Sequence, residues 1–223
     1  MIYAIFYKEW IKTRWFYLLA VIVTLGFSGY CMLRISRVAH LKGAAHLWEV
    51  MLQRDAIFLD LIQFIPLIVG ILMAIVQFTP EMQRKCLKLT LHLPCPQLKM
   101  TGIMLLSGFV LLLVLYFSNL LLMYFYLRTL LAPELVRHIL LTGLTWYVAG
   151  LAGYLLVTWI SLEPTWKRRM LNLIITVLLL RIFFLSDTPE AYNKFLPYMA
   201  LFTILTASFS WLSVVRFKAG KQD

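Results

Sequence analysis

The sequence predicts an all-α integral membrane protein with six transmembrane helices, and its composition is the first reason. Hydrophobic residues make up 62% of the 223 residues, whereas soluble domains contain roughly 45 to 50%. Charged residues make up 14%, against about 25% in a soluble domain, so there are too few of them to cover a water-facing globule. The apolar residues also gather into stretches about as long as one bilayer crossing, roughly 20 residues. A soluble fold is therefore excluded, and residues 1–223 are expected to form a single transmembrane domain.

Six apolar stretches account for most of the chain. A strand in lipid would leave its backbone groups unsatisfied, so each stretch is predicted to be helical. A closed β-barrel would need alternating polar and apolar positions, which the unbroken Leu and Val run at residues 111–115 does not show. The predicted spans cover residues 15–33, 57–78, 101–127, 139–162, 170–185 and 195–217.

Residues 1–14 are predicted to form an amphipathic elbow helix that lies in the membrane interface before the first span. An apolar and aromatic face opposes a polar face. Tyr and Trp favour the depth of the lipid headgroups, and we expect Lys or Arg beside them to reach anionic lipid phosphates. The alternative is that the first span begins early and frays. The charges in this segment argue against a cleavable signal peptide, so we expect the amino terminus to be retained. The apolar face contains Ile2, Tyr3, Phe6, Tyr7 and Trp10, and the polar face contains Lys8, Glu9, Lys12 and Thr13.

The distribution of Lys and Arg predicts that both termini are cytoplasmic. With this orientation thirteen of the 21 Lys and Arg residues lie inside, seven lie outside, and Arg181 lies within a span. Cytoplasmic loops carry such an excess of basic residues. The basic segment at residues 34–54 argues mildly for the opposite orientation.

Residues 79–100 are predicted to form the main cytoplasmic loop, with a short helix inside it. Thr79 can cap a helix that Pro80 opens, Glu81 suits its first turn, and two prolines, Pro94 and Pro96, stop it. The helix would carry an apolar side and a group of basic residues, the basic collar, and a protein partner could bind to both. The alternative is a basic loop that only fixes the topology. The apolar side contains Leu87 and Leu91, and the collar contains Arg84, Lys85 and Lys88.

The same loop resembles the signature loop of ABC-2 type transporter permeases. In that family a Glu, a basic residue, Gly-Thr, a leucine-rich helix, a Pro and a late Lys mark the coupling helix that docks into the ATPase. Here Glu81, Arg84, the leucines, Pro94 and Lys99 follow that pattern, whereas Lys85 and Cys86 stand where the family has Gly-Thr. The elbow, six spans and internal termini extend the resemblance over nearly the whole chain, mostly as architecture.

The resemblance implies a permease subunit of an ATP-binding-cassette exporter in the bacterial cytoplasmic (inner) membrane. ATP and Mg would be bound by separate cytoplasmic ATPase subunits, and the substrate path would form at the interface of a homodimer or a heterodimer with a second permease. A haem-exporter-like permease that serves cytochrome assembly is an alternative function within the same family. The residues that would couple to the ATPase are Glu81, Arg84, Lys85, Leu87, Lys88, Leu91 and Pro94.

The chain itself is not expected to be an enzyme. It has no G-x-x-x-x-G-K-[ST] motif for ATP hydrolysis, no H-E-x-x-H, and no Cys or His pairs at ligand spacing. Gly26-Phe27-Ser28-Gly29 matches the serine motif of rhomboid-type proteases, but the four histidines fall in loops or at span edges, so we interpret these small residues as packing sites. Gly150 and Gly153 have the same interpretation. A lipid-modifying enzyme is disfavoured for lack of catalytic groups, and a membrane anchor or assembly subunit without transport activity stays open.

Three polar residues inside predicted spans are candidates for a substrate path or gate. A cation deep in a span costs at least ~2.5 kcal/mol, so Arg181 needs a partner or an exit to the outer interface, where Asp187 or Glu190 can pair with it. Asn119 and Asn172 are weaker candidates, and the amides of Gln63 and Gln77 likewise need hydrogen-bond partners inside a span. Hydrogen bonding between helices is the default explanation for these amides.

Overall fold

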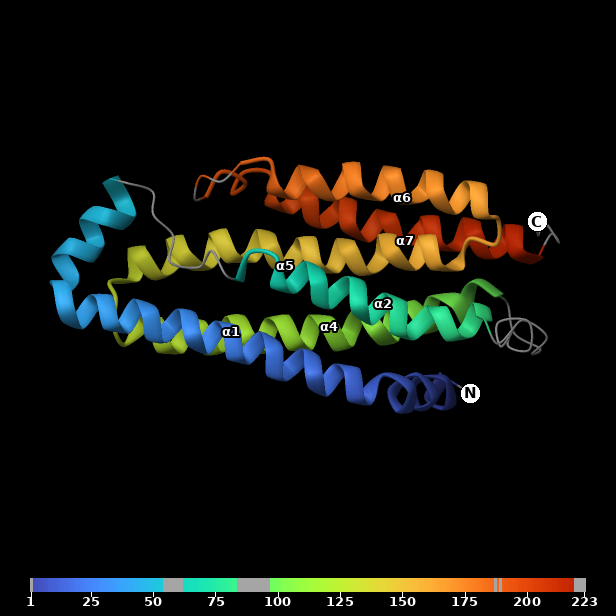
Figure 1. The fold of residues 1–223 in the computed structure, drawn as a ribbon, viewed down its shortest axis with the longest axis horizontal. Coiled ribbons are helices and arrows are strands. Elements are labelled where there is room, and N and C mark those ends of the chain that lie inside the picture. Colours follow the sequence, from blue (N-terminus) through green and yellow to red (C-terminus); the bar gives the residue numbers. More distant parts are fainter. Residues whose placement is uncertain (1, 54–61, 84–96, 187, 189, 219–223) are drawn as a thin grey trace.

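The computed structural model describes residues 2–53, 62–83, 97–186, 188 and 190–218, and within them the chain is helical and contains no strand. The helices lie side by side along the long axis of the molecule (Figure 1). They are α1 (Ile2–Gln53), α2 (Ile65–Gln83), α4 (Gln97–Arg128), α5 (Pro133–Leu162), α6 (Trp166–Arg181), the 3-10 turn η2 (Ile182–Phe184) and α7 (Leu196–Lys218).

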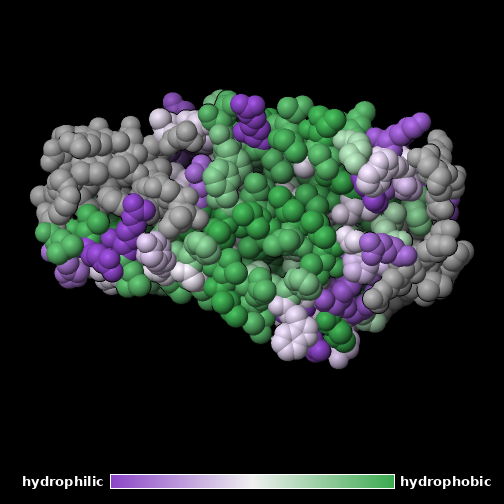
Figure 2. Space-filling view, in the orientation of Figure 1, coloured by the Kyte–Doolittle hydropathy of each residue, from purple (hydrophilic) through white to green (hydrophobic). Residues whose placement is uncertain are grey.

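Five of these helices are long and apolar enough to cross a membrane. Figure 2 shows the corresponding surface, in which hydrophobic residues form a broad central band and hydrophilic residues gather toward both ends. The predicted all-helical class is therefore confirmed for the described residues, and five of the helices could span a membrane. The sixth predicted span corresponds to α6, which has 16 residues and is continued by η2. The five apolar segments are Tyr3–Leu41, Ile65–Gln83, Lys99–Arg128, Pro133–Leu162 and Leu196–Lys218.

Helix α5 is the centre of the bundle. Of its most apolar stretch 72% is buried, compared with 28% for α1. It packs against α2, α4, α6 and α7, whereas α1 packs on α4 and α2 at the edge of the bundle. The first residue of α1 and the last residue of α7 lie at the same end of the molecule (Figure 1).

Glycines bring α2 and α5 into backbone contact. A Cβ atom at Gly70 would collide with the backbone carbonyl of Gly150, and a Cβ at Gly150 would lie 2.6 Å from the Pro66 carbonyl oxygen. Only a residue without a side chain fits at either position. The packing role that the sequence predicts for Gly150 is therefore confirmed, and so is that of Gly153, whose Cβ would meet Leu67 of α2 at 2.7 Å.

A buried hydrogen-bond network joins α2, α4 and α5 toward the end that holds the termini. The Tyr154 hydroxyl donates to Gln77 Oε1 at 2.8 Å, and Gln77 Nε2 donates to the Met104 carbonyl at 2.8 Å and to Ser107 Oγ at 3.2 Å. Gln77 and Tyr154 are completely buried. Interhelical hydrogen bonding, the default explanation for Gln77, is thus confirmed.

Helix α1 is continuous from Ile2, so no break separates residues 2–14 from the first span. Two local expectations are corrected. No new helix starts at Thr79, because α2 runs through Pro80 to Gln83 and leaves the Thr79 side chain inside its last turns. Gly26 and Gly29 do not mediate close packing, because a Cβ atom at either would meet nothing within 4 Å.

The α2–α5 contact generates a stability prediction. Gly70→Ala should lower the thermal stability of the detergent-solubilised protein, because the new methyl group must push the two backbones apart at a cost of ~1–3 kcal/mol. Gly29→Ala is the matched control. Its methyl group enters open space, and Ala has the better helix propensity by about 1 kcal/mol. Thermal unfolding followed by size-exclusion chromatography measures both, and equal stability of the two variants would contradict the packing argument.

Candidate functional site

The candidate site is a group of four charged residues, two of them buried carboxylates, at the end of the bundle that holds both termini. Lys8, Glu9 and Lys12 come from the first turns of α1, and Glu81 comes from the last turn of α2. We call these four residues the ionic cluster. The α2 carboxyl end, the α4 amino end and the turn between α5 and α6 all lie at this end of the molecule (Figure 1).

The two lysines of the ionic cluster share the Glu81 carboxylate. Lys8 Nζ and Lys12 Nζ each lie 2.9 Å from Glu81 Oε1. Lys12 Nζ also lies 2.9 Å from Glu9 Oε2, and Lys8 Nζ lies 4.0 Å from Glu9 Oε1. Glu9 and Glu81 are only 1% and 2% exposed, respectively. Two cations therefore balance two buried anions, as burial of charge requires.

Sequence reasoning placed the two faces of residues 1–14 correctly but misjudged which way the polar face points. The aromatic face is outward, with Tyr3 90% exposed, while Glu9 and Thr13 are buried against the bundle. Lys8 and Lys12 bind Glu81 instead of reaching toward lipid phosphates. Glu81, the carboxylate that both lysines share, belongs to α2, so residues 1–14 alone could not reveal this direction. The spacing of four residues between the lysines, one helical turn, was the available signal.

A second buried carboxylate lies at the same end and joins α5, α6 and α7. Glu163, directly after α5, is fully buried; Ser213 Oγ donates to its Oε2 at 2.5 Å and Arg216 Nη1 lies 3.5 Å from the same oxygen. Arg169 of α6 donates to the Glu163 carbonyl at 3.1 Å. Sequence analysis did not single out Glu163. Its place directly after an apolar span was the only local signal.

Of the predicted coupling residues, the structure describes only Glu81. Residues Arg84, Lys85, Leu87, Lys88, Leu91 and Pro94 lie outside the described part of the chain. The two ends of the predicted loop belong to helices, because residues 79–83 complete α2 and residues 97–100 begin α4. Glu81 is therefore the last structural anchor before the loop.

The three candidates for a substrate path lie at separate positions. Asn119 of α4 faces α1, where its Nδ2 donates to the Thr24 carbonyl at 3.4 Å. Asn172 is buried on α6, and Arg181 is the exposed last residue of that helix, roughly 13 Å farther along it. Arg181 is thus at a helix end and needs no buried partner. Glu190, one of its expected partners, lies 3.0 Å from His138 Nδ1 instead.

Asn172 and Thr176 leave polar atoms without a hydrogen bond on the buried face of α6. Asn172 Nδ2 and Thr176 Oγ1 are one turn apart, and neither has a partner among the described residues. Buried polar groups are normally satisfied, so this pair is a place where a water molecule or another polar group fits.

No group of three or more His, Cys, Asp or Glu side chains suited to a metal ion occurs among the described residues. Cys31, the cysteine whose surroundings the structure describes, is buried and is not part of a disulfide. The ionic cluster acts through electrostatic attraction, which holds the start of α1 against the end of α2.

Comparison of the chain with protein-family models, with curated proteins and with solved structures finds no match.

The ionic cluster predicts that the Glu81 charge stabilises the fold. Glu81→Gln should lower the free energy of unfolding by about 3 kcal/mol, because two lysines would then face one remaining carboxylate. Lys8→Gln should cost less, since Lys8 is half exposed and Lys12 still neutralises Glu81. Thermal unfolding in detergent measures both changes, and a Lys8 variant less stable than the Glu81 variant would contradict this assignment.

Proposed function

We propose that the chain is the transmembrane permease subunit of an ATP-binding-cassette exporter, driven by separate cytoplasmic ATPase subunits. The observation that carries the proposal is the position of Glu81. It is the first residue of the loop motif that resembles the ABC-2 coupling helix, and it is buried between two lysines of α1. A force applied to the loop at residues 79–100 would therefore act on α2 and α1 together.

The packing of α2 supports a route for that force into the rest of the bundle. Nucleotide-driven closure of the ATPases would press on the loop, which continues directly into α2 and α4. Because Gly70 and Gly150 place the α2 and α5 backbones in contact, α2 cannot tilt without moving α5. The Gln77 and Tyr154 hydrogen bond adds α4 to the same moving unit.

The proposal includes six crossings, an interfacial elbow and internal termini. Helix α6 with η2 extends roughly 30 Å, comparable to the hydrocarbon thickness of about 30 Å. The exposed aromatic face of the first turns of α1, with Tyr3, Tyr7 and Trp10, suits lipid headgroup depth. An even number of crossings is supported by the first helix beginning and the last helix ending on one side (Figure 1).

Export requires a path, which we place at the interface with a second permease, either an identical copy or a related subunit. Asn119, Asn172 and Arg181 are the proposed substrate path or gate residues. Buried polar atoms without a hydrogen-bond partner among the described residues, Asn119 Oδ1 on α4 and Asn172 Nδ2 and Thr176 Oγ1 on α6, support this role for both helices. The alternative functions are a membrane anchor or assembly subunit without transport activity and a haem-exporter-like permease of cytochrome assembly.

The permease proposal predicts an ATPase partner and a specific loss of coupling. The chain should co-purify with a cytoplasmic ATPase and stimulate its hydrolysis of ATP. Glu81→Gln combined with Leu87→Ala should abolish the stimulation, because the docking surface and its anchor are both altered, while membrane insertion is retained. Stimulated hydrolysis in mixed proteoliposomes is the measurement.

Glu163→Gln is the matched control for that experiment. It also removes the charge of a fully buried carboxylate at the same end of the bundle, but it lies outside the loop. This variant should keep most of the stimulation. Unchanged stimulation in the Glu81 and Leu87 double variant would contradict docking through the loop, and an insertion-competent chain that captures no ATPase would favour the anchor function.

The proposed orientation predicts the labelling of two native cysteines. Cys86 and Cys95 lie in the loop, so a membrane-impermeant maleimide should label them in inverted membrane vesicles and leave them unlabelled in intact spheroplasts. The buried Cys31 should stay unlabelled in both preparations. A Cys86→Ser and Cys95→Ser double variant shows that the signal comes from the loop. Labelling in intact spheroplasts alone would place the loop outside and refute the coupling role.

A further inference from the structure

We infer that a groove between α4 and α7 binds one acyl chain of an anionic phospholipid, whose headgroup phosphate is held by Lys99 and Lys218. This binding site goes beyond the proposed permease function and does not depend on it. Three features carry the inference: the shape and chemistry of the groove, its exposure on the outside of the bundle, and the two lysines beyond one of its ends.

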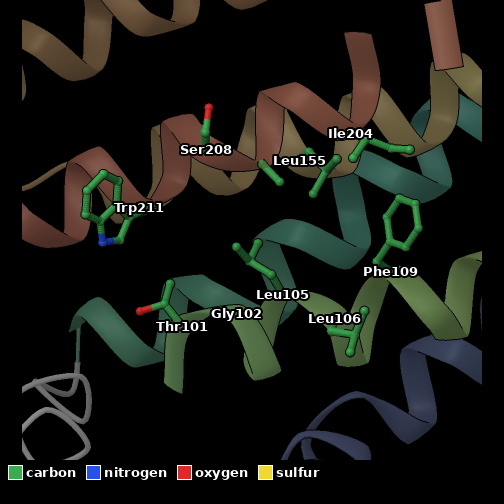
Figure 3. A pocket seen from close by; sticks show the side chains of 10 residues that line it. Thr101, Gly102, Leu105, Leu106, Phe109, Leu155, Ile204, Ser208 and Trp211 are labelled. Atoms are coloured by element: carbon green, nitrogen blue, oxygen red, sulfur yellow. The ribbon is translucent and has the colours of Figure 1, made fainter. Parts of the chain in front are cut away.

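The groove has a volume of about 440 Å³ and is lined almost entirely by apolar side chains. Figure 3 shows α4 on one side and α7 on the other, with Leu105 and Leu155 between them. Phe109 and Ile204 lie at one end of the groove, and Thr101 and Trp211 lie at the other. Residues 101–109 extend over roughly 12 Å of helix, close to the depth of one leaflet's hydrocarbon region.

The groove opens to the surface that faces lipid. Its rim residues Leu106, Ile204 and Trp211 are all substantially exposed, on helices that are long and apolar enough to span a bilayer. An empty volume of this size would deprive its lining atoms of van der Waals partners. On this face the protein is surrounded by lipid acyl chains. An acyl chain that enters the groove therefore restores the van der Waals contacts of its lining atoms.

The charge at one end of the groove selects the headgroup. Lys99 lies one turn before Gly102 on the same face of α4, and Lys218 lies two turns after Trp211 on the same face of α7. Both lysines are exposed, and neither has an acidic partner among the described residues. Nearby Arg216 is already paired with Glu163. Two free ammonium groups beyond the Trp211 end complement a phosphate at headgroup depth.

Gly102 makes the groove testable without disturbing the fold. A Cβ atom at this position meets nothing within 4 Å and Gly102 lines the groove, so the side chain of Gly102→Leu occupies space that the groove now leaves empty. Gly29→Leu is the matched control, because its Cβ also meets nothing within 4 Å but lies on α1. Lys99→Gln with Lys218→Gln removes the headgroup charges, and Lys167→Gln removes an exposed lysine of α6 at the same end.

The experiment uses the full chain in detergent with equal amounts of phosphatidylglycerol and phosphatidylcholine that have identical acyl chains. Native mass spectrometry counts the lipids retained. The wild-type protein should retain one phosphatidylglycerol, with a preference of roughly fivefold for each lysine. Gly102→Leu should lose this lipid, and the double lysine variant should lose the preference between the two lipids. Gly29→Leu and Lys167→Gln should behave like the wild type.

Three outcomes would overturn the inference. Equal retention of the two lipids by the wild-type protein would remove the role of the lysines. Retention that is unchanged in Gly102→Leu would place the lipid elsewhere. A dimer that carries no lipid and dissociates in Gly102→Leu would assign the groove to a second copy of the chain.

Discussion

The contact between α2 and α5 is the constraint on which the rest of the structure depends. Helices in lipid gain little from apolar burial against one another, so close packing at small residues has to hold them together. Gly70 and Gly150 allow this approach, and the same register lets Tyr154 reach Gln77 across the two helices. Gln77 then bonds to α4, and α1 docks on α2 through Glu81. The contacts of α2 with α4 and α1 therefore depend on the position of α2 against α5.

The two ends of the bundle are held together differently. At the end with the termini, Glu81 and Glu163 are buried carboxylates that each bind basic residues from a different helix. At the opposite end, His138 of α5 contacts Glu190 in the segment before α7. Buried ion pairs confer geometric specificity more reliably than net stability, because desolvation offsets much of their attraction. At the end with the termini, these ion pairs fix α1 relative to α2 and the end of α5 relative to α7.

Individual residues show which features of the structure the sequence predicted and which it did not. The apolar stretches predicted the helices and the membrane class, because helix length and hydropathy are local properties. Gly150 was recognised as a packing residue, whereas Gly26 and Gly29, with the same local signal, face open space. Arg181 was predicted to lie within a span, whereas α6 ends at that residue and its side chain is exposed. Glu163 escaped notice because its partners Ser213 and Arg216 are about fifty residues away in sequence.

The sequence alone determined that this chain is built of apolar helices, that residues 1–14 have an aromatic and a polar face, and that Glu81 stands at the head of a basic loop. These properties depend on composition and on a period of 3.6 residues, which neighbouring residues fix. Only the tertiary structure decided that the polar face of α1 turns inward, that Lys8 and Lys12 share Glu81, and that α4 and α7 leave an apolar groove between them. Those outcomes depend on which helices meet and in which rotation, and a single helix does not carry that information.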